Sequence, residues 1–228
     1  MGYAHFFNIL RQNCPIQGKE AMLHLVEPLS REDINSLADM HRDIGDSFTS
    51  ALGPQFVRRY WRFIEKSHLE SMFIYRDPDT SRLIGCLVVS FDKPSLQSRV
   101  LLGTFPHSFF WLLFRFLFSS YLRRLLWVVG KKIVFSEEKD DSPEIVFLYV
   151  SYEARNRKIA GELLQQAERH VLEKGYDILY TQTVQTAIGK SIRFYSKYGY
   201  VAFRISDFGI FRLTTLKKNL VRKNNQSQ

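Results

Sequence analysis

The order of elements predicted along this 228-residue sequence is typical of an α+β fold, with helices on both faces of a mixed sheet. Two observations carry that prediction. Two apolar runs, 72–75 and 83–91, flank the turn residues 77–80 (Asp-Pro-Asp-Thr), which indicates an antiparallel hairpin. Two further buried strands, 145–150 and 177–183, flank a long helical pattern, which indicates one parallel β-α-β unit. We therefore expect a three-layer α/β/α arrangement with mostly antiparallel pairs.

The elements before the hairpin are a strand and two helices. Residues 23–29 alternate enough to form a first strand. Ser30 then suits the N-cap of a helix, with Asp33 in the capping-box position that Glu or Gln usually holds. Pro54 is well placed in the first turn of a second helix, whose apolar residues recur through Ile64.

The C-terminal half continues the alternation of strands and helices. The helix after strand 145–150 should begin near Arg157 or Lys158 and end before Gly175, which suits the C′ position. Helical spacing returns at 189–197. Two final strands complete the sheet: 200–204 and 208–214. No repeat or linker divides the chain, so we expect one domain at 22–216, between an extension at 1–21 and a basic tail at 217–228.

Composition narrows the class of protein. A hydrophobic content of 45% with 14% aromatic residues excludes a wholly disordered chain. The two cysteines, Cys14 and Cys86, are too few for a metal cluster, and we expect reduced thiols, with Cys86 in a core strand. The N-terminal residues lack the charged and apolar regions of a secretory signal. The sequence therefore predicts a cytoplasmic protein with no metal site.

The net charge of +9 is unevenly placed. Residues 93–136 contain seven Lys or Arg and no Asp or Glu, so we interpret them as a basic insertion. Within it, 108–132 forms an amphipathic helical pattern, and its three arginines disfavour a membrane span. The helix either lies on an anionic membrane surface or packs on protein as a lid or homodimer helix. No nucleic-acid reading motif accompanies the charge, so we expect no nucleic-acid partner.

The strongest functional signal is a strand, a turn and a basic helix start at 144–164, an arrangement that can hold a phosphate group. Its turn, Arg-Asn-Arg-Lys-Ile-Ala at 155–160, resembles the (Arg/Gln)-x-x-Gly-x-(Gly/Ala) motif of the GNAT superfamily, the GCN5-related N-acetyltransferases. In that family the amides of this turn bind the pyrophosphate of acetyl-CoA. Lys158 replaces the middle glycine, and Asn156 occupies a position that is often glycine.

A second block, at 188–200, resembles the family's Asn-x-x-Ala-x-x-(Phe/Leu)-Tyr-x-Lys-x-Gly-Phe. Ile188 departs from the usual Asn, and Ser191 stands for the small Ala. The resemblance implies that Tyr195 protonates the departing CoA thiolate, a role that suits a phenol because it is protonated at neutral pH. The alternative is an aromatic side chain packed on the sheet, with its hydroxyl at the rim.

The candidate general base is Glu144. It falls where the histone-acetylating members of the superfamily carry their catalytic Glu, and it would deprotonate the amine directly or through water. The alternative is a solvated carboxylate. Asp43 and Asp46 are competing carboxylates, and His41 is a weaker candidate because a lone His at helical spacing is more often packed.

The N-terminal sequence also resembles a bacterial GNAT subgroup found with surface-polysaccharide genes, which has a similar Asp-Ser-Phe-x-x-x-Leu-Gly-Pro stretch. Since the first two helices of GNAT proteins usually line the acceptor pocket, this resemblance implies acceptor contacts from Asp46, Ser47 and Phe48. It also suggests an amino-sugar acceptor.

Together these resemblances imply a GNAT fold with splayed central parallel strands and an acetyl-CoA-dependent N-acyltransferase whose small-molecule amine attacks the thioester directly. The alternative is a non-catalytic CoA-binding or membrane-docked module with the same fold. The residues expected to bind acetyl-CoA come from the strand, the turn and the second block: Leu148, Tyr149, Val150, Arg155, Asn156, Arg157, Lys158, Ile159, Ala160, Gly161 and Ser191.

Overall fold

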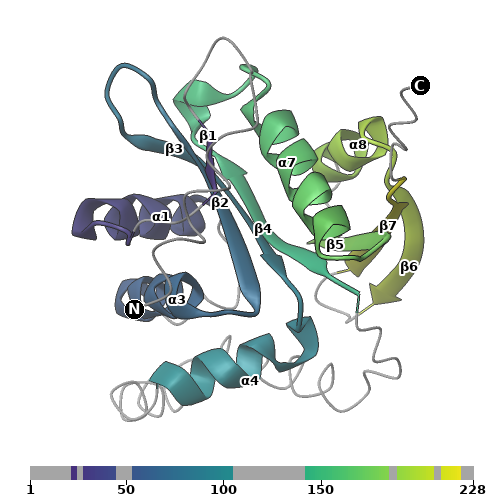
Figure 1. Ribbon diagram of the computed structural model, residues 1–228, viewed down its shortest axis with the longest axis horizontal. Coiled ribbons are helices and arrows are strands. Elements are labelled where there is room, and N and C mark those ends of the chain that lie inside the picture. Colours follow the sequence, from purple (N-terminus) through teal and green to yellow (C-terminus); the bar gives the residue numbers. More distant parts are fainter. Residues whose placement is uncertain are drawn as a thin grey trace, which may run out of the picture.

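The computed structural model describes residues 22–24, 28–44, 53–104, 142–184, 189–207 and 212–221. These residues form a seven-stranded sheet in the order β1-β2-β3-β4-β5-β7-β6 (Figure 1). Its strands are β1 Met22–His24, β2 Glu70–Arg76, β3 Leu83–Ser90, β4 Glu144–Val150, β5 Ile178–Val184, β6 Val201–Asp207 and β7 Arg212–Asn219. Only β4 and β5 pair in parallel, and the other neighbours are antiparallel. The predicted mixed, mostly antiparallel sheet is confirmed.

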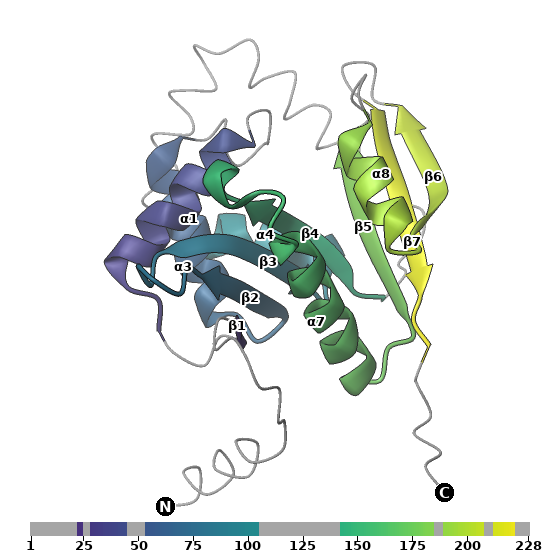
Figure 2. The same ribbon diagram turned by 90° about the horizontal axis from the view of Figure 1, so that it is seen from above.

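Helices cover both faces of this sheet. They are α1 Arg31–Asp43, α3 Pro54–Lys66, α4 Lys93–Thr104, α7 Ile159–Glu173 and α8 Lys190–Lys197, with a 3-10 turn, η1, at Tyr152–Ala154. Helices α1 and α3 pack on one face, and α7 packs on the opposite face (Figures 1 and 2). Helix α8 shares the face of α7, and α4 packs against α3. The three-layer arrangement is therefore as predicted.

The core has one apolar cluster on each face. Leu37, Trp61 and Val88 belong to the cluster under α1 and α3, and each is fully buried. Leu87 and Leu163 belong to the cluster under α7 and α8. Because β3 lies between the two clusters, every one of its residues is buried. This explains its nearly continuous apolar sequence and confirms Cys86 as a core residue.

The local signals at helix ends act as the sequence predicts. Ser30 Oγ accepts the Asp33 N–H at 3.0 Å, and the Asp33 carboxylate accepts the Ser30 N–H at 3.0 Å, which completes the capping box. Pro54 lies in the first turn of α3. Gly175, with φ of +90°, ends α7, and the next N–H, from Tyr176, donates to the Val171 carbonyl at 3.1 Å.

Three features differ from the sequence prediction. The sequence did not predict helix α4 inside the basic insertion. Among the side chains of α4 that the structure describes, Leu96 and Val100 are the only buried apolar ones, so the apolar pattern of a packed helix is weak. Strand β1 is shorter than 23–29, and it starts at Met22. Strand β7 continues beyond Leu216 to Asn219, so the basic tail begins later than expected.

Several predicted features lie outside the described residues. They are the extension at 1–21, the amphipathic helix at 108–132, the acceptor residues Asp46, Ser47 and Phe48, and Ile188. Among the residues that the structure does describe, no helix is both long and apolar enough to cross a membrane.

Candidate active site

The two central strands separate at one point of the sheet. Strands β4 and β5 are paired only at Glu144 with Tyr180 and at Ile145 with Thr181, and beyond these pairs they diverge (Figure 2). A register shift next to Ile145 leaves Val146 without a partner on β3, which is a β-bulge at the start of the divergence. Within the described residues, the edge of β4 after Ile145 therefore has no neighbouring strand on the side of β5. The predicted splay is confirmed.

The three residues of β4 expected to bind the donor lie along this open edge. Leu148 and Val150 pack partly against the cluster under α7. Tyr149 points to the opposite face, where its hydroxyl donates to the Asp43 carboxylate at 2.8 Å. Burial and the neighbouring Asp43 raise the pKa of Tyr149. Asp43 is thereby tied to β4 through the neutral phenol.

The turn after β4 has an unusual backbone. Asn156 and Lys158 have φ of +67° and +64°, whereas Arg155 has φ of −64° and Ile159 is helical. Alternating signs of φ turn successive N–H groups toward one side and form an anion-binding nest. In the described part of the chain, the N–H groups of residues 156–160 make no hydrogen bond. The turn therefore offers free main-chain donors at the N-terminus of α7, where the helix dipole also favours an anion.

The left-handed conformation explains why glycine is usual at these two positions. A non-glycine residue in this region costs about 1–2 kcal/mol, less for Asn, whose side chain tolerates it. Lys158 nevertheless starts α7, because its carbonyl accepts the N–H groups of Gly161 at 2.9 Å and Glu162 at 3.1 Å. Its side chain is exposed, and so is that of Asn156. Neither departure from the motif removes a main-chain donor.

Two arginines flank the nest. The Arg155 guanidinium lies over the rings of Tyr149 and Tyr152, 5.7 and 5.3 Å from their centres. Arg157 is exposed and lies 3.8 Å from the Asp77 carboxylate at the β2–β3 turn. These cations add positive charge beside the free N–H groups.

The second motif block places Tyr195 in the cluster under α7 and α8. Its ring makes edge contacts with Phe194 and Tyr200. Burial raises the pKa of Tyr195 to about 12; a hydrogen bond with Thr181 lowers it, and the Glu144 carboxylate raises it. Since Thr181 pairs with Ile145, the Tyr195 hydroxyl lies where β4 and β5 separate. It keeps its proton at neutral pH. Ser191, one turn earlier on α8, is exposed.

Glu144 begins β4 at the same point. It pairs across the sheet with Ser90 on β3 and Tyr180 on β5, and its side chain is only 10% exposed. The carboxylate is therefore not a solvated surface group, and it accepts a hydrogen bond from Lys93 Nζ at the start of α4. Sequence reasoning missed Lys93, whose only signal was its place at the start of the basic insertion.

His41 lies away from these groups in the packed core. Its ring stacks on Phe147 with centres 5.3 Å apart and meets Trp61 edge-on. Burial lowers the pKa of His41 to about 4, so the ring is neutral at physiological pH. These surroundings are those of a core residue.

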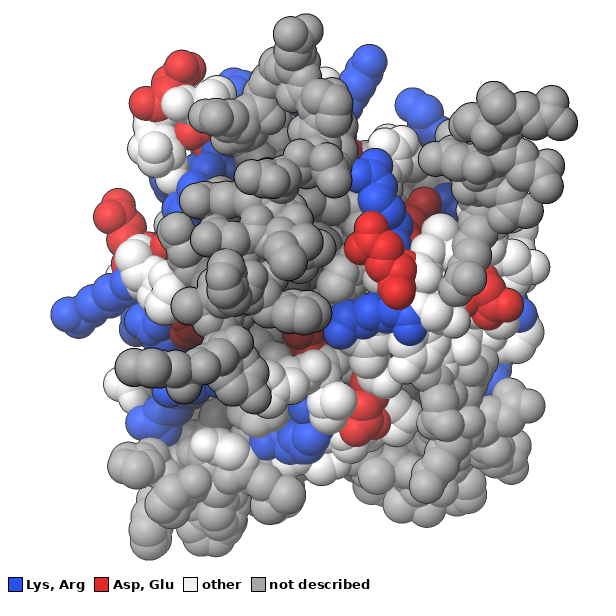
Figure 3. Space-filling view, in the orientation of Figure 1, with Lys and Arg blue, Asp and Glu red and all other residues white. Residues whose placement is uncertain are grey.

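On the face shown in Figure 3, the described residues form no patch of one charge sign. Among its described residues, Lys and Arg side chains are interspersed with Asp and Glu. In the same part of the chain, no group of three His, Cys, Asp or Glu residues is arranged to hold a metal ion.

Comparison with known proteins identifies the family. The model of the acetyltransferase (GNAT) family matches residues 37–200. An N-acetyltransferase structure from Staphylococcus aureus Mu50 is 16% identical, with a TM-score of 0.54 over 88% of this chain and 98% of that one. A protein structure from Pyrococcus horikoshii OT3 is 15% identical, with the same TM-score and the same coverage. No curated protein matches the sequence. Because the family model covers most of the chain, the protein belongs to the GNAT family of acetyltransferases, whose acyl donor is acetyl-CoA, as both motif blocks predict.

Proposed function

We propose that the protein transfers an acetyl or related acyl group from acetyl-CoA to the amine of a small molecule, by direct attack of the amine on the thioester. One observation carries this proposal. The open edge of β4 has the anion-binding nest beyond one end, and Glu144 and the Tyr195 hydroxyl lie at the other end. The groups that would bind phosphate and the groups that would transfer protons therefore lie at opposite ends of one strand.

The free N–H groups of residues 156–160 would hold the pyrophosphate, with charge added by Arg155, Arg157 and Lys158. The unpaired edge at Leu148–Val150 would hydrogen-bond the amide groups of the pantetheine arm. Gly161 and Ser191 border this path at the starts of α7 and α8. Bound acetyl-CoA supplies the activated acyl group, and no covalent enzyme intermediate is needed.

Two side chains would move the protons. Glu144 takes the proton of the incoming ammonium, directly or through water, so that the nitrogen lone pair can attack. Tyr195 gives its proton to the departing sulfur. Burial raises the pKa of the phenol and so keeps it protonated at neutral pH, which leaves a proton available for the departing sulfur.

We infer that the acceptor is an amino sugar from the sequence resemblance at Asp46, Ser47 and Phe48, and we infer a cytoplasmic protein from its cysteines. The segment 108–132 is the candidate for contact with the inner membrane face or with a second copy of the chain.

A second function stays open because two observations favour it. Lys158 occupies a strained backbone conformation in the nest, and Lys93 is paired with the candidate base. Both would suit a non-catalytic module that binds CoA without turnover.

Calorimetric titration with acetyl-CoA, followed by thiol release over a panel of amines, separates the two functions. The enzyme should bind acetyl-CoA and release CoA faster with one class of amine. Binding without release would support the module, and a failure to bind acetyl-CoA would contradict both. Product mass spectrometry on the active amine then identifies the acceptor, with amino sugars as the first class tested.

A further inference from the structure

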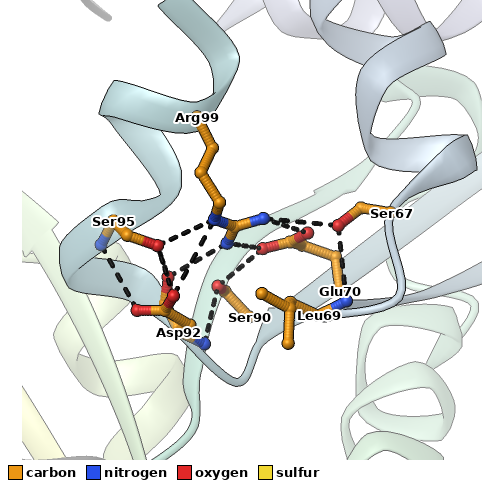
Figure 4. Close-up of polar contacts among 7 residues, drawn as sticks. All are labelled: Ser67, Leu69, Glu70, Ser90, Asp92, Ser95 and Arg99. Atoms are coloured by element: carbon orange, nitrogen blue, oxygen red, sulfur yellow. Dashed lines mark hydrogen bonds and ion pairs between the residues drawn. The ribbon is translucent and has the colours of Figure 1, made fainter. Parts of the chain in front are cut away.

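Helix α4 is fixed to the sheet by a polar network around Arg99 (Figure 4). Arg99 donates to both carboxylate oxygens of Glu70, at 2.6 and 3.2 Å, and the Glu70 side chain is fully buried. Arg99 also donates to the Asp92 carbonyl at 3.1 Å and to Ser95 Oγ at 2.7 Å. Ser90 Oγ donates to Glu70 at 3.0 Å. The bidentate pair and its neighbours hold the first turns of α4 against the ends of β2 and β3.

This anchoring sets the position of Lys93. Lys93 begins α4 shortly after the end of β3 at Ser90, and Glu144 is the β4 residue that pairs with Ser90. The Lys93 ammonium therefore reaches the Glu144 carboxylate, with side chains 25% and 10% exposed. A primary amine of the protein itself is thus paired with the candidate base, at the place where an acceptor amine would be deprotonated.

We propose that Lys93 is an acetyl acceptor in its own chain, so that the enzyme modifies this lysine by the reaction that it performs on its substrate. This inference rests on the proposed function. The Lys93 ammonium is already paired with the Glu144 carboxylate, and the Tyr195 hydroxyl lies near the same carboxylate. The turn that carries Lys93 is closed by a hydrogen bond from Ser95 to Asp92, and Arg99 holds the helix to Glu70 on β2. An amine held in this way needs no separate binding step.

The atoms of the reaction balance with acetyl-CoA as the only co-reactant. The ammonium gives one proton to Glu144, and its lone pair then forms a bond to the thioester carbonyl carbon. The carbon–sulfur bond breaks, the sulfur leaves with the electron pair, and Tyr195 protonates it. The nitrogen loses a second proton to solvent as the amide forms, and solvent returns the proton of Tyr195. Glu144 then releases its proton to solvent, so the products are acetyl-Lys93, CoA and one proton.

Acetylation would also change the candidate base. An amide carries no charge, so it cannot form the ion pair that now occupies Glu144. The carboxylate then becomes accessible to an external amine. Self-acetylation would therefore precede full activity toward the acceptor.

The test is peptide mass spectrometry of the full chain incubated with isotope-labelled acetyl-CoA. Lys66, exposed in the last turn of α3, serves as the internal control for uncatalysed acetylation. Lys93 should be labelled at least ~10-fold faster than Lys66, and Glu144→Gln should remove that difference, since a general base contributes a factor of this size or more. The rate should not depend on protein concentration, because the transfer stays within one chain. Labelling of Lys93 no faster than Lys66 overturns the proposal.

A second measurement needs no acetyl-CoA. In reductive methylation, an ion-paired ammonium reacts more slowly than a free one, so Lys93 should lag behind Lys66, and Glu144→Gln should abolish the lag. Equal rates in the wild type contradict the ion pair on which the proposal depends. If Glu144→Gln fails to fold, the comparison of the two lysines in the wild type still decides.

The outcomes also separate this inference from the proposed function. An enzyme that acetylates an amine of the panel but leaves Lys93 unlabelled would refute self-acetylation alone. A chain that does not bind acetyl-CoA would refute both.

Discussion

The Tyr198 hydroxyl lies directly against the α-carbon of Gly161, so that α8 contacts the first turn of α7 with no space for a side chain between them. A Cβ at Gly161 would overlap the Tyr198 hydroxyl and the ring carbon that carries it. The contact joins the helix of the candidate acid to the helix of the anion-binding nest. The close approach gives a physical reason for a small residue at this position.

Gly161→Ala should therefore destabilise the protein although alanine favours helix. The overlap forces the Tyr198 side chain away from α7 and out of its present packing, which costs about 1–3 kcal/mol of the free energy of unfolding. In a Tyr198→Ala background the clash is absent, and the same change should stabilise by up to about 1 kcal/mol. Denaturant titrations of the four proteins in this double-mutant cycle measure the coupling. Additive effects would show that the two helices are not in contact here.

Tyr195→Phe tests the general acid. Loss of the phenolic proton should lower kcat by about 10²-fold or more, with little change in the affinity for acetyl-CoA. Steady-state kinetics and calorimetry give the two quantities. Tyr198→Phe is the matched control, since it removes a hydroxyl from the residue that caps the C-terminus of α8 and lies against Gly161 rather than Glu144. If Tyr195→Phe keeps its kcat, the acid is another group.

The Asp33–Arg76 pair makes stability depend on pH. Burial alone would raise the pKa of Asp33, but hydrogen bonds from Arg76, at 2.7 and 3.0 Å, and from Ser30 outweigh it and hold the pKa below its ordinary value. A carboxylate with a lowered pKa in the folded state stabilises the protein above its unfolded pKa, and the contribution is lost as pH falls through the folded value.

Asp33→Asn keeps the shape of the side chain and removes its charge. It should cost about 1–2 kcal/mol near neutral pH, a range that allows for solvent screening of the partly exposed Arg76. The difference from wild type should shrink once pH drops below the ordinary Asp pKa of 3.8. Thermal unfolding from pH 7 to pH 3 measures it. A constant difference over that range would mean that the charge of Asp33 does not contribute.

Sequence reasoning succeeded where local physics decides the structure. The capping box at Ser30 and Asp33, the helix end at Gly175 and the turn at Asp77 each depend on residues within one turn of chain. The two motif blocks also identified the turn after β4 and the helix that brings Tyr195 to the point where β4 and β5 separate.

Long-range contacts account for what the sequence did not reveal. Helix α4 is held by the pairing of Arg99 with Glu70 on strand β2, and its own sequence carries little apolar periodicity. The pairing of Lys93 with Glu144 likewise depends on which strands are neighbours. The backbone conformation of Lys158 could not be read from the motif, because a departure from glycine suggests a lost site as readily as a strained one.

The Lys158→Gly variant tests whether the lysine in place of glycine marks a lost acetyl-CoA site or only a strained backbone. The donors of the nest are main-chain N–H groups, and the Lys158 side chain is exposed, so the variant should bind acetyl-CoA within a few-fold of wild type. Glycine relieves a left-handed strain of about 1–2 kcal/mol but loses up to about 1 kcal/mol in chain entropy, so the free energy of unfolding should stay equal or rise slightly. Lys158→Ala, which keeps the strain and removes the charge, is the matched control: a weaker affinity common to both variants would assign a role to the ammonium. A large gain in affinity for Lys158→Gly alone would instead show that the natural lysine closes the nest, which would favour the non-catalytic module over the enzyme.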